Sequence, residues 1–307
     1  MPHAIRVYEP GGPEQMRWEP VETPAPQAGE ALVRHTAVGL NYIDVYHRTG
    51  LYPLGDSPFG LGTEAAGVVE AVGEGVTRVA PGDRVAYVAL PPGAYAEERV
   101  VAAERLVRLP DGIDDQTAAA MMLQGMTAQY LLRRTCPVQA GDTILIHAAA
   151  GGVGLIVCQW ARLLGATVIG TVGSDEKAQL AKDHGCDHPI VYTREDFQQR
   201  VQEITDGKGV RVVYDSVGKD TIMGSLDSLA RFGMLVLFGQ SSGPVEPFDL
   251  GLLAAKGSLF ITRPTLFHYT AAVEDLDRTA AELMDVVEKG AVKIEVNQTY
   301  PLKDVAR

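Results

Sequence analysis

The pattern of apolar and polar positions changes near residue 110 of this 307-residue chain. Before that point, short β-branched runs are separated by turns that contain Gly and Pro, and they lie at residues 31–34, 66–72 and 83–88. Such spacing is typical of antiparallel strands joined by tight turns. One helix is expected inside this region at residues 41–49, with Asn41 as its N-cap and Gly50 just past its end. The pattern therefore predicts a compact, mostly antiparallel β unit.

From about residue 115 to 264, strand-like apolar runs alternate with helical stretches. The runs fall at residues 143–147, 167–172, 190–192, 210–214, 234–238 and 258–262. The helical patterns between them cover residues 153–164, 175–184, 195–205 and 220–231. This alternation predicts an α/β domain in which right-handed crossovers build a parallel sheet covered on both faces. Beyond residue 264, one clear helix is expected at about 272–289.

A glycine-rich turn at residues 147–154 carries the most specific chemical signal in the chain. The apolar run that ends at Ile146 leads into this turn, and a helical pattern follows it directly. Laid on the pattern G-x-G-x-x-G, Ala149 takes the first glycine position, Gly151 the second and Gly154 the third. A side chain at the second position would keep the backbone away from a pyrophosphate, and the helix N-terminus offers unpaired N–H groups to the anion. The turn therefore predicts a dinucleotide site, against the plainer interpretation of an ordinary tight turn.

The residues after the next strand indicate which dinucleotide binds. A site selective for NAD places a carboxylate about 20 residues beyond the glycine turn, where it grips the ribose 2′-hydroxyl. Gly173 holds that place here, and a hydroxyl, an ammonium and a phenol follow at Ser174, Lys177 and Tyr192. These groups suit a dianionic 2′-phosphate, so NADPH is favoured, although the acidic pair that follows Ser174 argues the other way. Lys177 also has a plainer interpretation as a solvated charge on a helix face.

Charge and composition exclude several classes of partner. The chain carries 27 Lys and Arg against 39 Asp and Glu, which gives a net charge of −12. Nucleic acids and anionic membranes bind basic patches that displace counterions, so neither is expected as a partner. The three cysteines are widely spaced and odd in number, which suggests neither a disulfide framework nor a metal knuckle. Because no signal-like or membrane-spanning apolar stretch is found, a cytoplasmic protein is the simplest interpretation.

Several long motifs in a fixed order connect the chain with a known family. They are Gly11-Gly12-Pro13-Glu14 and the segments 38–46, 50–53, 60–69, 147–154 and 213–218. On these motifs the chain resembles the zinc-free quinone oxidoreductases, the zeta-crystallin-like branch of the medium-chain dehydrogenase/reductase superfamily. The resemblance implies an α/β protein with a GroES-like, mostly antiparallel β substrate domain and a Rossmann domain built on a doubly wound parallel sheet.

The same resemblance implies how the chain is divided. We expect the first part of the substrate domain at residues 1–122, the Rossmann NADPH-binding domain at 123–264, and the return segment of the substrate domain at 265–307. Relatives continue past residue 307 with a helix and a last strand, so the return segment is expected to lack these elements and an arginine that touches the cofactor in relatives. A homodimer is also implied, joined by edge strands of the two Rossmann sheets near residues 250–264.

The resemblance also argues against a metal ion. Zinc-dependent cousins hold catalytic zinc with a Cys where this chain has Asn41, and with a His where it has Thr63. An amide and a hydroxyl are poor zinc ligands. The four-cysteine structural zinc lobe has no counterpart, since no cysteine precedes Cys136. Glu64 remains from the zinc-site pattern, but one carboxylate cannot hold zinc alone, so no metal is expected.

The resemblance assigns seven residues to the lining of the nicotinamide cleft: Asn41, Asp44, Tyr46, Tyr52, Gln124, Thr127 and Tyr130. Among them, Asn41, Tyr46 and Tyr52 are the candidate catalytic residues, because they can hydrogen-bond a quinone oxygen as it gains charge. Plainer interpretations stay open, with Asn41 serving only as a helix N-cap and the two tyrosines serving only as packing aromatics.

The remaining cofactor contacts fall at the strand ends of the expected Rossmann domain. The resemblance places the pyrophosphate at Gly152 and Val153, next to the motif glycine Gly151, and the 2′-phosphate at Gly173, Ser174, Lys177 and Tyr192. It places the nicotinamide side at Ser216, Val217, Phe238, Gly239 and Ser241, and the domain junction at Arg263, Pro264 and Thr265. Arg263 has an alternative interpretation as a surface salt-bridge former.

Two other patterns suggest catalysis and are set aside. Residues 239–243 match G-x-S-x-G, the nucleophile elbow of hydrolases, which requires a helix straight after the serine. Pro244 and Pro247 follow Ser241 and disfavour that helix. His147 stands alone without a named partner, so we expect a strand-end residue rather than a catalytic base.

Together these features predict an NADPH:quinone oxidoreductase that transfers hydride from NADPH to a small-molecule quinone without a metal. A quinone is a strong hydride acceptor whose reduced oxygens take protons from water, so the absence of an obvious acid–base pair fits this substrate better than a ketone or alcohol. One alternative is an NADPH-dependent reductase of C=C bonds in enones or 2-alkenals, which needs a proton donor at the α-carbon. Another is an NADPH-binding structural or sensor protein with little turnover.

Overall fold

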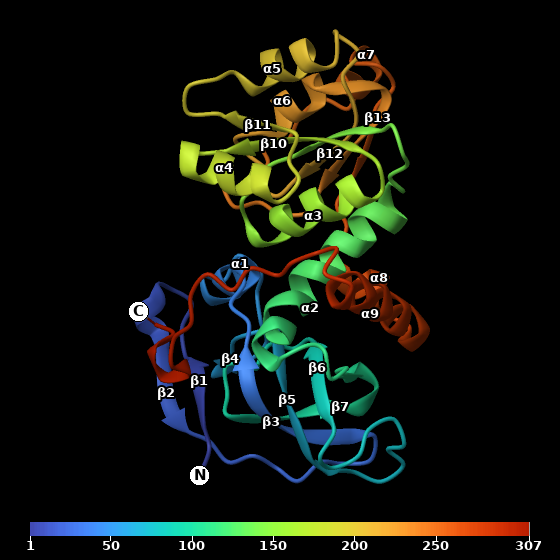
Figure 1. The fold of residues 1–307 in the computed structure, drawn as a ribbon. Helices are drawn as coiled ribbons and strands as arrows, with labels where there is room; N and C mark the ends of the chain where they lie inside the picture. Colours follow the sequence, from blue (N-terminus) through green and yellow to red (C-terminus); the bar gives the residue numbers. More distant parts are fainter. Residues whose placement is uncertain (307) are drawn as a thin grey trace. The chain divides into compact units, whose positions relative to one another are not determined.

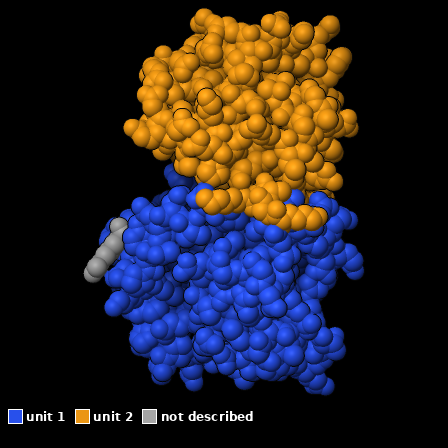
Figure 2. Space-filling view, viewed as in Figure 1, with its two compact units in different colours: residues 1–126, 270–288, 294–307 blue, residues 127–269, 289–293 orange. Residues whose placement is uncertain are grey.

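The computed structural model describes residues 1–306, and these residues form two compact units. The first unit contains Met1–Met126, Thr270–Glu288 and the residues from Ile294 onward. The second unit contains Thr127–Tyr269 and Lys289–Lys293. Figure 2 colours the first unit blue and the second orange. The C-terminal part of the chain thus contributes to both units, with its long helix belonging to the first.

The first unit contains two antiparallel sheets (Figure 1). The three-stranded sheet has the order β2-β1-β4, and the five-stranded sheet has the order β7-β3-β5-β6-β8. Buried residues of β3, β5, β6 and β7 form the main core of this unit with loop residues such as Val79 and Leu106, and a second cluster lies around Ile5 and Val7 of β1. The expectation of a mostly antiparallel β unit is confirmed. The strands are β1 His3–Val7, β2 Met16–Pro20, β3 Glu30–Val38, β4 Phe59–Gly60, β5 Glu64–Val72, β6 Arg84–Val88, β7 Glu98–Ala102 and β8 Val107–Arg108.

The helices of the first unit include one that the sequence pattern did not predict. The expected helix at 41–49 is α1, Tyr42–Arg48, and the expected helix at 272–289 is α9, Val273–Glu288. Helix α2, Asp115–Tyr130, was missed because buried residues surround it on nearly every side and leave no polar stripe. The unit boundary falls inside this continuous helix, between Met126 and Thr127. Short 3₁₀ turns complete the unit at Pro13–Gln15, Ala103–Arg105 and Leu302–Asp304.

The second unit is built on one parallel sheet of six strands with the order β11-β10-β9-β12-β13-β14. Counted from β9, this is the strand order 3-2-1-4-5-6 of doubly wound nucleotide-binding folds. The order reverses between β9 and β12, and a ligand binds such a sheet outside the carboxyl ends of the strands at that point. The strands are β9 Thr143–Ile146, β10 Thr167–Val172, β11 His188–Val191, β12 Val210–Asp215, β13 Leu229–Leu237 and β14 Phe260–Thr262.

Helices connect the strands of the second unit (Figure 1). They are α3 Gly152–Leu163, α4 Asp175–Asp183, α5 Phe197–Ile204, α6 Ile222–Asp227 and α7 Gly251–Ala255. A π-helical turn at Leu131–Thr135 precedes β9, and α8 Leu266–Tyr269 follows β14. Helix α3 packs against the sheet through a fully buried apolar face that includes Leu155, Ile156 and Val157. The expected parallel α/β domain is therefore confirmed.

The helix expected at residues 220–231 is partly wrong. Helix α6 ends at Asp227, and strand β13 already begins at Leu229. Leu229 pairs with Val210 of β12 and is buried in the core, and Phe232 takes a left-handed conformation with φ of 63°. Strand pairing and burial therefore override the local helical pattern. Within the described part of the chain, every helix is too short or too polar to cross a lipid bilayer.

Candidate functional site

The glycine-rich turn joins β9 to α3 at the point where the strand order reverses. Gly151 is the N-cap of α3, no side chain caps the helix, and no acidic residue lies in its first turn. The first N–H groups of a helix lack intrahelical partners, and they carry the positive end of the helix dipole. Gly152 is exposed, so its N–H is accessible to an anion, whereas the Gly151 N–H is already donated to the Ala148 carbonyl. The N–H groups of Gly152 and Val153, beside the bare backbone of Gly151, thus fit a pyrophosphate.

Close packing explains the third glycine of the motif. A Cβ atom at Gly154 would lie 2.3 Å from the carbonyl oxygen of Ala148 and 2.7 Å from that of Ala149. Ala148 itself has a φ of 53°, a left-handed conformation that L-residues other than Gly, Asn and Asp adopt at a cost. Its carbonyl accepts a hydrogen bond from the Gly151 N–H at 2.8 Å, which holds the turn in shape. The backbone conformation of the turn is therefore fixed by contacts that leave no room for a side chain.

The groups predicted to bind a 2′-phosphate gather at the carboxyl end of β10. Ser174 caps α4 and accepts a hydrogen bond from the Lys177 N–H at 3.3 Å, and the Lys177 side chain is exposed. Tyr192 is 56% exposed, and its hydroxyl would lie 3.0 Å from a Cβ at Gly173. The absence of a side chain at Gly173 therefore leaves space beside the Tyr192 phenol. With Ser174 and Lys177 the donor set fits a phosphate group, although the Ser174 hydroxyl hydrogen-bonds the carboxylate of Glu176.

One of the two acidic residues that argued against NADPH, Asp175, forms an ion pair with Arg194. Nη1 and Nη2 of Arg194 donate to the two carboxylate oxygens of Asp175, at 2.8 and 2.5 Å. The hydrogen bond from Arg194 lowers the pKa of Asp175, so the carboxylate stays ionised and paired. The pair is exposed, and salt screens it. Asp175 is therefore directed to Arg194 rather than to a nucleotide.

The predicted nicotinamide residues come together where β12 and β13 end. Ser241 donates its N–H to the Ser216 carbonyl at 3.1 Å, and a Cβ at Gly239 would lie 2.6 Å from the same carbonyl oxygen. Phe238 and Gly239 both donate N–H groups to the carbonyl of Asp215. The β12 and β13 loops thus form one connected surface that includes Ser216, Val217, Phe238, Gly239 and Ser241. No helix follows Ser241 before α7 begins at Gly251, so the hydrolase elbow is absent from this described segment.

A buried polar network behind these loops was missed by the sequence analysis. The Asp215 carboxylate accepts hydrogen bonds from the N–H groups of Val217 and Gly218 at 2.8 and 3.0 Å, and from the Ser225 hydroxyl at 2.8 Å. His147 lies 2.9 Å from that hydroxyl through Nε2, and its Nδ1 lies 2.8 Å from the Thr171 hydroxyl. Burial lowers the pKa of His147. This histidine therefore links the end of β9 to β10 and α6. It is a strand-end residue as predicted, and its role in holding these elements together was not predicted.

In the first unit, Asn41 holds a second buried polar cluster. Its Nδ2 donates to Glu64 Oε1 at 2.5 Å, and its Oδ1 accepts from Gln124 Nε2 at 3.1 Å. The other Glu64 oxygen accepts the Leu123 N–H at 2.7 Å. Burial raises the pKa of Glu64 to about 8, although the hydrogen bonds from Asn41 and from the α2 backbone lower it. Asn41 is the N-cap residue of α1, but its side chain is committed to Glu64 and Gln124.

Asp44 extends this cluster toward a small cavity. Its Oδ2 accepts the Asn41 N–H at 2.9 Å and the Tyr95 hydroxyl at 2.8 Å, whereas its buried Oδ1 has no partner. Burial raises the pKa of Asp44 to about 7. The cavity beside it has a volume of about 50 Å³, enough for a water molecule. The sequence shows Asp44 three residues after the N-cap Asn41 and Glu64 directly after Thr63. These positions do not reveal that both carboxyl groups are buried.

The two candidate catalytic tyrosines pack against each other in the first unit, with their rings tilted by 55°. The rings of Tyr46 and Tyr52 have centroids 5.0 Å apart, and Tyr42 meets Tyr46 edge-on at 5.2 Å. Tyr46 is buried, Tyr52 is half-buried and Tyr42 is 57% exposed. The Tyr52 N–H donates to the Tyr46 carbonyl at 3.0 Å, which fixes the loop after α1. Packing is therefore part of the role of these side chains.

Five further predicted residues lie in the second unit. Thr127 is buried on α2, and Tyr130 is buried and stacked on Tyr269 with ring centroids 4.4 Å apart. Arg263 follows β14 and donates to the Leu237 carbonyl at 2.9 Å. Pro264 and Thr265 continue from it and are half-buried. The stacking of Tyr130 gives this residue a structural role in its own unit.

The positions that hold zinc in cousins carry an amide and a hydroxyl here. Asn41 is hydrogen-bonded as described, and the buried Thr63 hydroxyl has no partner. Among the described residues, no group of three or more His, Cys, Asp or Glu side chains could hold a metal ion. The Asn41 amide and the Thr63 hydroxyl are thus not the ligand types that zinc prefers.

Comparisons with known proteins match both units. Residues 27–111 match the family described as alcohol dehydrogenase GroES-like domain, and residues 152–280 match the family described as zinc-binding dehydrogenase. A quinone oxidoreductase of Pseudomonas aeruginosa is 54% identical over 307 residues, which are 100% of this chain and 94% of that protein. A 2-haloacrylate reductase of a Burkholderia species is 48% identical over 312 residues, with 99% and 93% covered. A crystal structure of Escherichia coli quinone oxidoreductase complexed with NADPH has a TM-score of 0.97, with 47% identity, 99% of this chain and 94% of that chain covered.

Proposed function

The chain belongs to the quinone oxidoreductases of the medium-chain dehydrogenase/reductase superfamily, and on this premise we propose that it transfers hydride from NADPH to a quinone without a metal ion. One structural observation carries the proposal. The uncapped, glycine-lined N-terminus of α3 and the phosphate-suited group around Lys177 lie on the same parallel sheet, at the ends of its adjacent strands β9 and β10. This pairing fits a dinucleotide that carries a 2′-phosphate.

NADPH supplies the hydride when it is bound, from C4 of its nicotinamide. In this proposal, the N–H groups of Gly152 and Val153 bind the pyrophosphate, and Ser174, Lys177 and Tyr192 bind the 2′-phosphate. The loops after β12 and β13 line the nicotinamide through Ser216, Val217, Phe238, Gly239 and Ser241. Asp215 keeps the first of these loops in place by accepting two of its N–H groups.

The first unit supplies the residues proposed to contact the acceptor. Glu64 and Gln124 hold the Asn41 amide in a fixed orientation. Little reorganisation energy is therefore needed for this amide to stabilise a quinone oxygen that gains charge. Tyr46 and Tyr52 add two phenols on an aromatic surface against which a flat quinone ring can stack. The protons needed by the reduced oxygens come from water, and no Lewis acid is required.

The function is tested by the oxidation of NADPH and NADH against a panel of acceptors, with metal analysis of the same protein sample. We expect NADPH to be oxidised with 1,4-benzoquinone, with little oxidation of NADH and no change on treatment with a chelator. Stoichiometric zinc, or activity that a chelator abolishes, would contradict the metal-free proposal. NADPH binding by fluorescence without oxidation by any acceptor would favour the structural or sensor alternative.

A second candidate function is the reduction of activated C=C bonds. The 2-haloacrylate reductase relative at 48% identity favours it, because its named substrate is an activated alkene. This reaction needs a proton at the α-carbon, and Asp44 and Glu64 are the buried carboxyl groups of the first unit whose raised pKa values keep protons near neutral pH. If an acyclic enone is reduced and benzoquinone is not, this candidate replaces the first.

We also propose a homodimer joined by edge strands. Strand β14 is the last strand of the sheet, and Phe260 and Ile261 on it are 56% and 36% exposed. Unpaired strand edges with apolar side chains associate readily. We expect Ile261→Lys to convert a dimer into monomers in analytical ultracentrifugation, while the exposed control Met223→Lys on α6 leaves it dimeric. A wild-type monomer at micromolar concentration would contradict the proposal.

A reducing, cytoplasmic location is proposed from the three free, buried cysteines.

A further inference from the structure

A pocket in the first unit lies apart from all of the residues assigned above. It has a volume of about 250 Å³ and is lined by residues of β1, the segment 21–24, the end of β4, the loop after β6 and strand β7. This volume is well above the roughly 10–15 Å³ that one water molecule needs, so the pocket has room for a small molecule. Four of its lining residues are charged: Arg6, Glu22, Glu98 and Arg99.

The guanidinium of Arg99 is only partly satisfied. Its Nη2 donates to the Pro91 carbonyl at 2.5 Å, and its Cζ lies 5.7 Å from the centroid of the Tyr87 ring. Its Nη1 is buried and has no hydrogen-bond partner. A buried donor without an acceptor is uncommon in native proteins and points to a missing partner.

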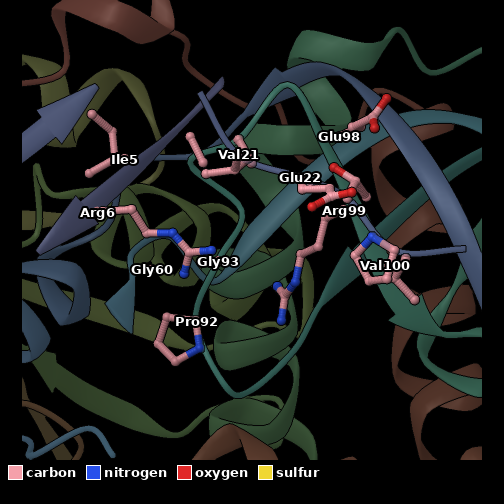
Figure 3. A pocket seen from close by; sticks show the side chains of 14 residues that line it. Ile5, Arg6, Val21, Glu22, Gly60, Pro92, Gly93, Glu98, Arg99 and Val100 are labelled. Carbon is pink, nitrogen blue, oxygen red and sulfur yellow. The ribbon is translucent and has the colours of Figure 1, made fainter. Parts of the chain in front are cut away.

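Arg6 adds a second cation to the same pocket. The ion pairs of the described residues include neither Arg6 nor Arg99, although Glu22 and Glu98 line the same pocket. Figure 3 shows both arginine side chains reaching toward the part of the pocket beside Pro92 and Gly93, with Glu22 and Glu98 on its other side. The pocket thus presents two guanidinium groups at one side and two carboxylates at the other.

Two glycines allow close packing of the backbone at the wall of the pocket. A Cβ at Gly60 would lie 3.0 Å from the Gly93 Cα, and a Cβ at Gly93 would lie 3.2 Å from Arg99 Nε. Glycines at both positions therefore let β4 and the loop approach each other closely and let the Arg99 stem lie against the loop. The guanidinium is held in one orientation by the Pro91 carbonyl and the Tyr87 ring, which reduces the entropy lost when it binds an anion.

We propose that this pocket binds a small hydroxylated molecule with one oxyanionic group, a carboxylate or a phosphate. The guanidinium groups of Arg6 and Arg99 donate to the oxyanion, because such groups match its planar or tetrahedral oxygens with several N–H donors. Glu22 and Glu98 accept hydrogen bonds from hydroxyl groups at the other end of the ligand. A ligand with two anionic ends is disfavoured by these carboxylates.

The test uses isothermal titration calorimetry on the protein saturated with NADPH, at constant ionic strength. Glycerol 3-phosphate tests the phosphate form of the ligand, and lactate tests the carboxylate form. Propyl phosphate and propionate are the matched probes without hydroxyl groups. We expect one site per chain for at least one hydroxylated probe, and binding at least tenfold weaker for its matched probe.

The variants Arg6→Gln and Arg99→Gln are expected to weaken that binding at least tenfold. Arg17→Gln is the matched control, since Arg17 is paired with Arg6 in the β1–β2 register but lies outside the pocket. Arg99→Lys keeps a cation against Tyr87 should the glutamine variant fail to fold, and Arg6→Gln gives an independent readout. Absence of saturable binding, equal binding by Arg6→Gln and Arg17→Gln, or equal binding of probes with and without hydroxyl groups overturns the proposal. NADPH affinity measured by fluorescence stays the same in all four variants, which separates this pocket from the nucleotide site.

Discussion

The two candidate sites of this protein are built in opposite ways. In the second unit, the glycine-rich turn before α3 offers exposed main-chain N–H groups, and the side chains mainly have to stay out of the way. In the first unit, the buried Asn41 and Glu64 and the half-buried Gln124 form a site from side chains that orient one another over 83 residues of sequence. A main-chain site fails when a side chain is added, whereas a side-chain site fails when one is removed. This difference gives each site its own test.

The largest effect is expected when a side chain is added to the main-chain site. Gly154→Val places a Cβ within 2.3 Å of the Ala148 carbonyl, so the turn has to shift. We expect roughly 100-fold weaker NADPH binding, and a loss of about 1–3 kcal/mol in unfolding free energy from overpacking. Nucleotide fluorescence titration and thermal denaturation measure the two effects. Gly55→Ala, where a Cβ meets nothing within 4 Å, is the control, and unchanged NADPH binding by Gly154→Val would mean that the turn does not hold the nucleotide.

Removing a side chain from the other site should leave the nucleotide bound. Asn41→Ala deletes both the donor to Glu64 and the acceptor for Gln124. Because loss of an oriented donor to a developing oxyanion costs about 10²–10³ in rate at a fully formed site, and a quinone needs less help, we expect kcat to fall roughly 10- to 100-fold. The NADPH dissociation constant should stay within twofold. The other asparagine, exposed Asn297, is the control, and a wild-type kcat for Asn41→Ala would remove Asn41 from catalysis.

The buried carboxyl group of Glu64 should also make the stability of the protein depend on pH. The pKa of Glu64 is raised from its ordinary value of 4.5 to about 8, so the folded protein binds a proton that the unfolded chain has released. Stability therefore falls as pH rises through this window, by at most about 1.4 kcal/mol per pH unit. Measurement between pH 7 and 8 avoids the opposite slope from His35, whose pKa burial lowers to about 4.

Glu64→Gln isolates that contribution, because glutamine cannot ionise. We expect urea denaturation to give a flatter pH dependence for Glu64→Gln than for the wild type between pH 7 and 8. Glu70→Gln, a change at a surface carboxylate that pairs with Arg34, should retain the wild-type slope. The same slope in Glu64→Gln and the wild type would show that Glu64 is ionised in the folded protein.

The smallest effect is expected at the exposed rim of the nucleotide site. Lys177→Gln removes one cation near Ser174 and Tyr192, and exposed charge pairs contribute only up to about 1 kcal/mol. We expect NADPH binding to weaken about fivefold, with NADH binding unchanged and the difference shrinking at high salt. Lys182→Gln, later on the same helix, is the control. Equal weakening of NADPH and NADH would mean that Lys177 does not contact the 2′-phosphate.

The sequence by itself determined much of the second unit and little of the first unit's chemistry. The glycine turn, Gly173 and the alternation of strands and helices are local patterns, and local sterics force their backbone conformations wherever they occur. The Asn41 cluster and the network from Asp215 to His147 depend on residues far apart in the chain that come into contact in the folded protein and are buried there. Helix α2 escaped prediction for the same reason, since its all-round burial erased the polar stripe that marks a surface helix. Burial decides whether a carboxyl such as Asp44 keeps its proton, and burial exists only once the whole chain has folded.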